Sequence, residues 1–266
     1  KIDKEYLNDL HNHLESFSKE INTYLSLNKN NIEILNKNEI LKDYTSLYEL
    51  MSQFKQDDSS NLENYYTIMK QYIIDECNFK TYFYDDEYND SNSKQCISKL
   101  IKEISTYNNS LPISYDSSIF VKYDSTNIRK LKVLIIGPKD TPYENGCFIF
   151  DILIPHDYPE NPPRVNLQTT GNGSVRFNPN LYNNGKVCLS LLGTWSGSGG
   201  EKWNKNTSTI LQILVSIQSL ILVENPYFNE PGYEKMINTE KGKISNFEYN
   251  DKTQYNTIKW AINDNI

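Results

Sequence analysis

Apolar positions in the first third of the chain recur at spacings of three and four residues, the pattern of an amphipathic helix. One such stripe runs over residues 7–24 and a second over 39–54. Ser60 and Glu63 match a capping box, so a third helix is expected to begin there and to continue to about residue 79. We interpret this region as a small helical bundle or a flank on the neighbouring domain, with a partner-binding coiled coil as the alternative.

The helical pattern ends in an aromatic, acidic stretch over residues 82–92, which we interpret as a linker. It divides the chain into a helical N-terminal extension with its linker, 1–92, and a second domain, 93–266. The second domain opens with another amphipathic pattern over 93–108. We therefore expect a helix at the start of this domain.

Four runs of alternating or β-branched apolar residues follow, with short turns between them. Short connections favour antiparallel neighbours, because parallel strands need a longer crossover. A proline-rich loop, residues 158–163, separates the third run from the fourth and cannot be helical. The sequence predicts a four-stranded antiparallel meander, with strands at 118–123, 131–136, 146–154 and 164–169.

Helical patterns return in the last quarter of the chain. A run of almost continuous apolar residues predicts a buried helix over 207–222, which ends before Pro226. Two more helices are expected, one beginning by Pro231 and one over 247–262. The predicted fold class is α+β, with one helix before the sheet and three after it.

Composition and charge limit the partners of the chain. A net charge of -7 and an isoelectric point near 5.1 argue against a nucleic-acid backbone as the main partner. No apolar run reaches the roughly 18 residues that span a bilayer, and the first residues lack the apolar core of a secretory signal. We expect no nucleic-acid and no membrane partner, and a cytoplasmic location with the nucleus as the alternative. Because Lys1 is not a start methionine, we expect a piece of a longer protein.

The four cysteines, Cys77, Cys96, Cys147 and Cys188, have no zinc-site spacing, and the three histidines add no helical ligand pair. A disulfide framework is not expected in a long chain without a secretion signal. The sequence therefore predicts free thiols, no metal and no cofactor.

One stretch, residues 175–192, holds the candidate chemistry. Cys188 lies there between apolar residues, and Asn180 precedes it behind a proline. An Asn-Asn-Gly turn signal between the two favours a constrained loop. A thiolate can carry an acyl group as a thioester, and a nearby amide can donate a hydrogen bond to an oxyanion. We expect acyl-transfer chemistry at a Cys188 thiol that is open to solvent.

Four motifs occur in order along the second domain: YPENPP at 158–163, FNPN at 177–180, GKVCLSLL at 185–192 and ILVENP at 221–226. Together with the predicted order of helices and strands, they resemble the ubiquitin-conjugating enzyme family over residues 93–263. The longer strings around them are most similar to the branch that includes the giant inhibitor-of-apoptosis hybrid of conjugating enzyme and ligase. The resemblance implies the ubiquitin-conjugating enzyme fold, preceded here by the helical extension.

The resemblance also implies a reaction and the residues that perform it. Such an enzyme accepts ubiquitin from a ubiquitin-activating enzyme as a thioester on Cys188 and passes it to a lysine of a protein substrate or to a ubiquitin ligase. Asn180 matches the asparagine that stabilises the oxyanion or orders the loop, and Ser190 matches a gate position. Glu230 matches an acidic position that orients the acceptor lysine and lowers its pKa. Trp203 matches a tryptophan of the loop that helps bind ligases.

Three positions depart from the pattern of the family. Asn178 replaces the histidine of its His-Pro-Asn motif, a histidine thought to be structural. Glu160 occupies a position where many members have a large apolar residue for ligase contact, and Lys205 one where they often have proline. The differences at Glu160 and Lys205 weaken the expectation of ordinary RING-type ligases as partners.

Each assigned residue also has a plainer interpretation. Cys188 could be a core residue, and Asn180 could serve only to satisfy the loop backbone. Glu230 could be a charge favoured at a helix N-terminus, and Ser190 an ordinary loop residue. For the whole chain, the alternatives are a non-catalytic ubiquitin-binding or scaffold variant and a conjugating enzyme for another ubiquitin-like modifier. A cysteine hydrolase is more distant, because no His/Asp partner pattern is visible.

Overall fold

The computed structural model describes residues 66–85, 93–114, 117–195 and 202–263 of the chain. Its compact unit begins at Tyr66. The helices expected before that residue, and the capping box of the third, lie outside the described residues.

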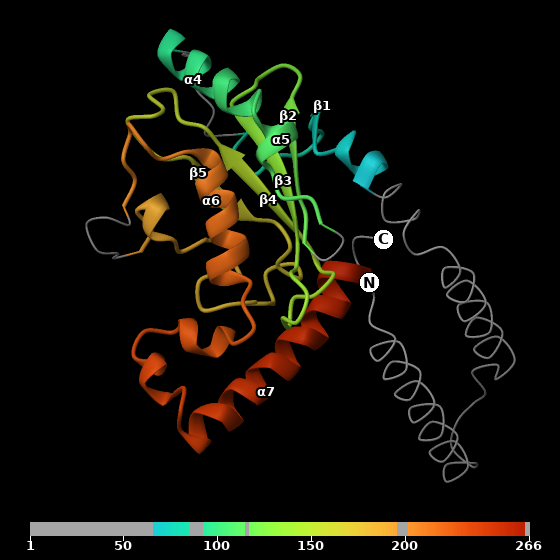
Figure 1. The fold of residues 1–266 in the computed structure, drawn as a ribbon, viewed down its shortest axis with the longest axis vertical. Helices are drawn as coiled ribbons and strands as arrows, with labels where there is room; N and C mark the ends of the chain where they lie inside the picture. The colour runs from blue at the N-terminus through green and yellow to red at the C-terminus, as the bar shows by residue number, and fades with distance from the viewer. Residues whose placement is uncertain (1–65, 86–92, 115–116, 196–201, 264–266) are drawn as a thin grey trace, which may run out of the picture. The chain divides into compact units, whose positions relative to one another are not determined.

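In the described part of the chain, a five-stranded sheet forms the centre (Figure 1). Four of its strands are antiparallel neighbours in chain order, which confirms the predicted meander. They are β2 (Ile119–Asp124), β3 (Lys130–Ile136), β4 (Cys147–Leu153) and β5 (Arg164–Leu167). Successive side chains of a strand point to opposite faces, so the alternating residues Leu131, Val133 and Ile135 of β3 all enter the core.

The fifth strand, β1 (Ile74–Cys77), pairs with β2 in parallel. The sequence predicts helix as far as about residue 79, and here that prediction is wrong. The Val121 N–H donates to the Ile73 carbonyl at 2.8 Å, and the Ile73 side chain is fully buried. Pairing with the edge of β2 therefore holds this apolar segment extended, and only residues 66–70 before it are helical.

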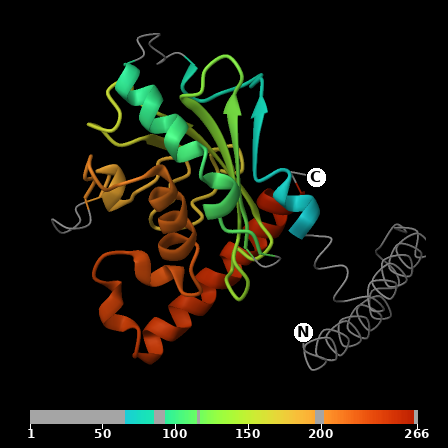
Figure 2. The same ribbon diagram turned by 45° about the horizontal axis from the view of Figure 1, so that its top comes forward.

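Two helices precede the meander on one face of the sheet (Figures 1 and 2). α4 (Lys94–Ile104) begins after Ser93, whose side chain accepts a hydrogen bond from the Cys96 N–H. This cap explains why the helix starts where it does. A short helix, α5 (Tyr107–Ser110), follows it, so the helical prediction over 93–108 is confirmed.

The buried helix predicted after residue 207 is α6 (Ile210–Ser216), which ends in a π-helical turn, Ile217–Ile221. Thr209 and Gln212 form a capping box at its start. The carboxylate of Glu103, on α4, also accepts a hydrogen bond from the Ile210 N–H at 2.9 Å. A negative charge is favoured at a helix N-terminus, so this contact joins the two helices across the core.

Two of the helices predicted near the end of the chain differ in the structure. α7 (Glu240–Asn256) begins well before residue 247, because Thr239 caps it by accepting from the Gly242 N–H. The helix expected by Pro231 is instead a short 3-10 turn, Tyr233–Met236. None of the helices in the described ranges is long and apolar enough to cross a membrane.

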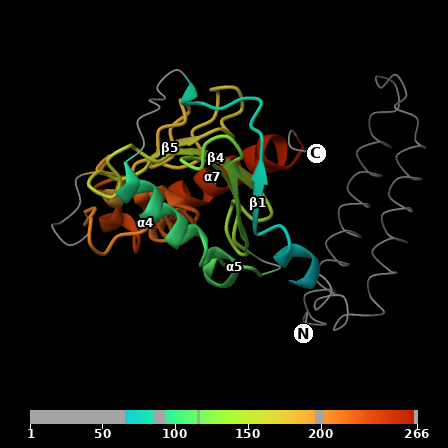
Figure 3. The same ribbon diagram turned by 90° about the horizontal axis from the view of Figure 1, so that it is seen from above.

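Residues 78–85, which we call the aromatic strap, cross the sheet on the face opposite α4 (Figure 3). The Tyr82 hydroxyl donates to the Ile152 carbonyl at 2.6 Å, and the Phe83 N–H donates to the Asp151 carboxylate at 2.8 Å. Tyr84 is buried beneath the Arg164 guanidinium. Part of the stretch interpreted as a linker is therefore packed on the sheet, and the compact unit includes residues well before the boundary expected at residue 93.

Candidate active site

The segment that carries Cys188 folds back on the segment that carries Asn180. The Cys188 N–H donates to the Asn180 carbonyl at 2.8 Å, and a β-bridge joins Leu181 to Val187 beside it. Gly185, in the turn between them, has a φ of 84°, and a Cβ there would lie 2.3 Å from the nearest atom. Only glycine fits this position, so the turn fixes the register between the two candidate residues.

The Asn180 side chain reaches back to the cysteine. Its Nδ2 donates to the Cys188 carbonyl at 2.9 Å. The plainer role expected for Asn180, satisfying the loop backbone, is therefore observed. A carboxamide has two N–H donors, and this bond uses one of them. The second can serve an oxyanion that develops next to the Cys188 sulfur.

Cys188 is more buried than the sequence suggests. It exposes 2% of its surface, although thioester chemistry led us to expect an open thiol. Its neighbours Val187 and Leu189 belong to the hydrophobic core and hold this stretch of backbone inward. Cys188 therefore offers little of its surface to an acyl donor in this conformation.

Thr194 ties the two flanks of the cysteine together, an arrangement we call the Thr194 clasp. Its hydroxyl donates to the Val187 carbonyl at 2.7 Å and accepts from the Leu189 N–H at 3.0 Å. Thr194 itself is exposed, so water competes for these bonds and the clasp can open at low cost. No motif in the sequence singled this residue out.

Ser190 lies at the start of a 3-10 turn, Ser190–Leu192, directly beyond the cysteine. Its carbonyl accepts from the Gly193 N–H at 3.0 Å, and Gly193 has a φ of 65° that lets the chain reverse. Ser190 is half-buried at the rim of the site. Its role as a gate stays a prediction.

Glu230 is linked to the same loop through Arg176. The Arg176 guanidinium donates to the Pro179 carbonyl at 2.6 Å and to the Glu230 carboxylate at 3.4 Å, and it lies over the Tyr182 ring. Both charged side chains are about two-fifths exposed, at 43% and 40%. Exposed ion pairs are weak, so Glu230 can exchange this partner for another cation. Sequence reasoning missed Arg176 because surface arginines carry no motif.

Tyr249, on α7, borders this cluster. Its hydroxyl donates to the Phe177 carbonyl at 3.4 Å. Burial raises the pKa of Tyr249 to about 12, the Arg176 charge opposes that rise, and the Glu230 charge adds to it. The phenol is therefore neutral at physiological pH and acts as a hydrogen-bond donor.

Asn178, which the sequence marked only as a departure from its family pattern, is fully buried. Its side chain bonds the Asn180 N–H, the Tyr143 hydroxyl and the Ile221 carbonyl. The sequence carried no signal of this burial, because Asn178 lies among other polar residues, such as Arg176 and Asn180, that are not fully buried.

The other cysteines and the possible ligands do not form a second chemical centre in the described ranges. Burial raises the pKa of the Cys96 and Cys147 thiols and keeps them protonated at neutral pH. Within those ranges, no group of three or more His, Cys, Asp or Glu side chains is arranged to hold a metal ion.

Comparison with known proteins places this loop in a family. The family described as ubiquitin-conjugating enzyme matches residues 99–256, more than half of the chain. The chain belongs to the ubiquitin-conjugating enzyme family. The match spans Cys188, Asn180 and Glu230, and it confirms the fold expected from the four motifs.

Individual members of the family resemble the chain to different extents. It is 56% identical to the human dual E2 ubiquitin-conjugating enzyme/E3 ubiquitin-protein ligase BIRC6 over 178 residues, which are 67% of this chain and 4% of that protein. It is 38% identical to the probable ubiquitin-conjugating enzyme E2 R521 of Acanthamoeba polyphaga mimivirus over 95% of this chain and 19% of that protein. Human ubiquitin-conjugating enzyme E2 Z is 46% identical over 64% of this chain and 44% of its own length. The chain thus spans less than half of each of these relatives.

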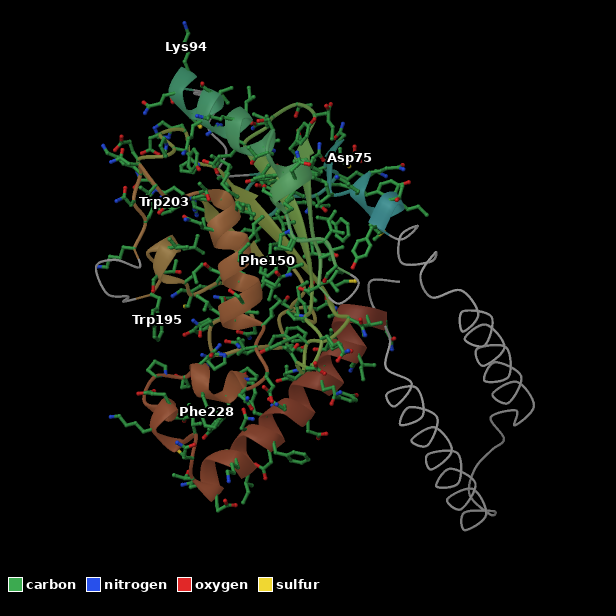
Figure 4. All side chains as sticks on the ribbon, in the orientation of Figure 1. Asp75, Lys94, Phe150, Trp195, Trp203 and Phe228 are labelled. Atoms are coloured by element: carbon green, nitrogen blue, oxygen red, sulfur yellow. The ribbon has the colours of Figure 1, made fainter. Side chains whose placement is uncertain are left out.

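The surface that the ubiquitin-conjugating enzyme family is expected to offer to ligases is unusual in this chain. The Trp203 indole N–H donates to the Pro159 carbonyl at 2.7 Å, which docks the tryptophan on the proline loop (Figure 4). The Lys205 ammonium bonds both carboxylate oxygens of Glu160, at 3.0 and 2.9 Å. Two of the three residues that depart from the family pattern therefore pair with each other, and they form an exposed ion pair.

Proposed function

We propose that this chain is a ubiquitin-conjugating enzyme that carries ubiquitin as a thioester on Cys188. The observation that carries the proposal is the Asn180 carboxamide, bonded at 2.9 Å to the carbonyl of that cysteine. It puts a fixed hydrogen-bond donor beside the one thiol of residues 175–192, which can hold an acyl group as a thioester. Membership of the family supports the same reaction.

In the first step, the Cys188 thiolate attacks the carbonyl carbon of the ubiquitin thioester held by an activating enzyme. The new C–S bond forms as the thiolate of the activating enzyme leaves. In the second step, a lysine amine of a substrate attacks the Cys188 thioester, the Cys188 thiolate leaves and the amine loses its proton. A ligase thiol can take the place of the amine as acceptor.

We assign the second N–H of Asn180 to the oxyanion that forms in both steps. Donors fixed before charge develops stabilise it without reorganising. Glu230 attracts the acceptor lysine once its contact with Arg176, 3.4 Å long and exposed, is exchanged. Opening of the Thr194 clasp exposes the thiol before charging. Asn180 thus meets the negative charge of the oxyanion, and Glu230 meets the positive charge of the acceptor lysine.

The proposal is tested by incubating the chain with a ubiquitin-activating enzyme, ubiquitin and ATP, followed by gel electrophoresis with and without reducing agent. We expect an adduct of the chain with one ubiquitin that the reducing agent cleaves and that Cys188→Ala lacks. Cys147→Ala, which alters another partly buried thiol, serves as the matched control and keeps the adduct. No adduct with any activating enzyme would contradict the proposal.

The burial of Cys188 favours a second candidate, a ubiquitin-binding or scaffold variant without catalysis. Such a protein binds ubiquitin equally well with and without the thiol. Ubiquitin binding that survives Cys188→Ala, combined with no charging, would support it. A panel of activating enzymes with their ubiquitin-like modifiers distinguishes a third case, an enzyme for another modifier. We propose a cytoplasmic location, since all four cysteines are free thiols.

A further inference from the structure

Asn178 lies two residues before Asn180 and is completely buried. A buried carboxamide is costly unless its donors and acceptors are paired. Here all of its hydrogen-bonding positions are occupied. Nδ2 donates to the Ile221 carbonyl at 2.8 Å and to the Tyr143 hydroxyl at 3.0 Å, and Oδ1 accepts from the Asn180 N–H at 2.8 Å and from Asn229 Nδ2 at 3.4 Å.

These four contacts come from separate parts of the chain. Tyr143 lies in the turn between β3 and β4, and Ile221 ends the helix that α6 begins. Asn229 belongs to the loop marked by Phe228 in Figure 4 and directly precedes Glu230. It is also anchored by its bond to the Leu220 carbonyl, at 3.1 Å. One side chain thus joins the backbone of Asn180 to the loop of Glu230.

We propose that Asn178 is a positioning residue that sets Asn180 and Glu230 relative to Cys188 for the transfer step. The inference rests on the proposed function. None of its four hydrogen bonds goes to Cys188 or to Glu230, so it acts through Asn180 and Asn229. Its bond to the Asn180 N–H fixes the backbone from which the oxyanion donor projects. Its bond to Asn229 fixes the residue before the acidic side chain.

The contacts select an amide at this position. Two donors and two acceptor positions must come from a single short side chain, and only asparagine provides them in that volume. Aspartate has the same shape but would turn a carboxylate oxygen toward the Ile221 carbonyl. Histidine, the usual residue of the family motif, has two ring nitrogens and can meet two of the four contacts. We therefore expect neither to replace Asn178 fully.

The test separates charging from discharge in single-turnover reactions. The enzyme is charged with ubiquitin, charging is stopped, and transfer to free lysine is followed by loss of the thioester. For Asn178→Ala we expect thioester formation within about twofold of wild type and discharge slowed on the order of tenfold or more, because a displaced oxyanion donor loses much of its effect. Unchanged discharge in a folded Asn178→Ala protein would overturn the proposal.

A double-mutant cycle distinguishes positioning from a general loss of stability. If Asn178 acts through Asn180, then Asn178→Ala slows discharge much less in an Asn180→Ala background than in the wild type. Multiplicative losses would show that the two residues act independently and would overturn the proposal. The same cycle with Asn229→Ala and Glu230→Ala tests whether Asn229 acts through Glu230. We expect the second substitution to slow discharge much less once the first is present.

Two milder variants cover the case in which Asn178→Ala does not fold. Tyr143→Phe removes one hydroxyl that bonds Asn178, and Asn229→Ala removes one partially exposed amide. Each is expected to slow discharge and to leave charging near wild type. If both discharge at the wild-type rate, the proposal fails. If the wild type itself is never charged, the proposed function fails instead, so the two failures are distinguishable.

Discussion

The Asn180 carboxamide donates a hydrogen bond to the Cys188 carbonyl. A donor held in place in this way changes little during the reaction, so its contribution appears where negative charge develops. A thiolate leaves in both steps, but the nucleophile is a thiolate in charging and an amine that must lose its proton in transfer. In transfer to an amine, we expect the rate to depend more on how well the oxyanion of the tetrahedral intermediate is stabilised. The two steps should therefore depend on Asn180 to different extents.

Asn180→Ala is expected to form the thioester but to discharge it to lysine roughly 10²-fold more slowly, the usual cost of removing one oxyanion donor. Single-turnover discharge assays measure both steps. Asn183→Ala, which alters a neighbouring exposed asparagine of the same loop, is the matched control. Equal losses in charging and discharge would contradict an oxyanion role.

Glu230→Ala is expected to reduce transfer most at low pH. The acceptor lysine has a pKa near 10.4 in water, so help with its deprotonation matters most where protons are abundant. A pH profile of discharge from about pH 6 to 9 measures this. Arg176→Gln removes the cation paired with Glu230 but keeps the carboxylate, and it should not give the same pH dependence. A loss that is constant with pH would count against the assignment.

At the level of elements, we expect the Thr194 clasp to limit how often Cys188 is reached. Thr194→Val keeps the shape of the side chain and removes the hydroxyl that bonds Val187 and Leu189. Hydrogen bonds contribute about 1 kcal/mol each, so we expect Cys188 to react with a thiol reagent about fivefold faster or more. Peptide mass spectrometry reads the rate at each cysteine. Thr194→Ser retains the hydroxyl, so Cys188 in this variant should react at the wild-type rate. Equal Cys188 rates in the wild type and both variants would contradict the role of the clasp.

The aromatic strap depends on Asp124, at the end of β2. Its carboxylate accepts from the Phe79 N–H at 3.0 Å and from the Thr126 N–H at 2.9 Å. Burial alone would raise the pKa of Asp124, but hydrogen bonds from Thr126 and Phe79 and the charge of Lys130 outweigh it and lower the pKa. The stability that this carboxylate contributes is present above its unfolded pKa, near 3.9, and is lost as the pH falls through the lower folded pKa.

Asp124→Asn should therefore cost stability at neutral pH, and the difference from wild type should shrink as the pH falls below about 4. Urea unfolding at several pH values gives the free energies of unfolding. Asp75→Asn, a more exposed carboxylate on β1, is the comparison and should show a smaller effect. A difference that stays constant into acid would mean that the charge of Asp124 does not stabilise the fold.

For the whole molecule, the compact unit includes the residues from Tyr66 onward. A chain that begins at residue 93 loses the β1 pairing with β2 and the buried side chains of Ile73, Tyr82 and Tyr84. Each fully buried apolar side chain contributes about 1.5–3 kcal/mol, so we expect a melting temperature lower by roughly 5–15 °C. A chain that begins at residue 66 should melt close to the full chain. Equal melting of the chains from 66 and 93 would contradict the assigned role of the strap.

Much of this fold could be predicted because its strands and first helix are locally consistent. The apolar, β-branched run of β3 and the helical spacing of the apolar residues in α4 are both visible in the sequence. β1 was missed since Ile73 and Ile74 fit a helix face equally well, and only the distant edge of β2 makes them extended. The turn at Tyr233–Met236 was missed because Pro231 marks helix starts and 3-10 turns alike.

The sequence predicted which residues form the site, but not how buried they are or which distant residues contact them. The turn at Gly185 made the approach of Asn180 and Cys188 foreseeable, and the structure brings them together. Val187 and Leu189, which flank Cys188, join a core that is built from residues far along the chain, and local patterns do not encode such packing. The contacts of Asn178 and Arg176 likewise join segments separated by tens of residues.

The most direct test of the account uses Cys188→Ser. Serine keeps a nucleophilic oxygen in place of sulfur, so this variant should form a ubiquitin adduct that resists reducing agent, where the wild-type adduct is cleaved by it. Intact mass spectrometry after incubation with activating enzyme, ubiquitin and ATP measures both adducts. We predict a reducible adduct for the wild type, a resistant one for Cys188→Ser and none for Cys188→Ala. A reducible adduct that persists in Cys188→Ala would place the chemistry on another cysteine and contradict the account.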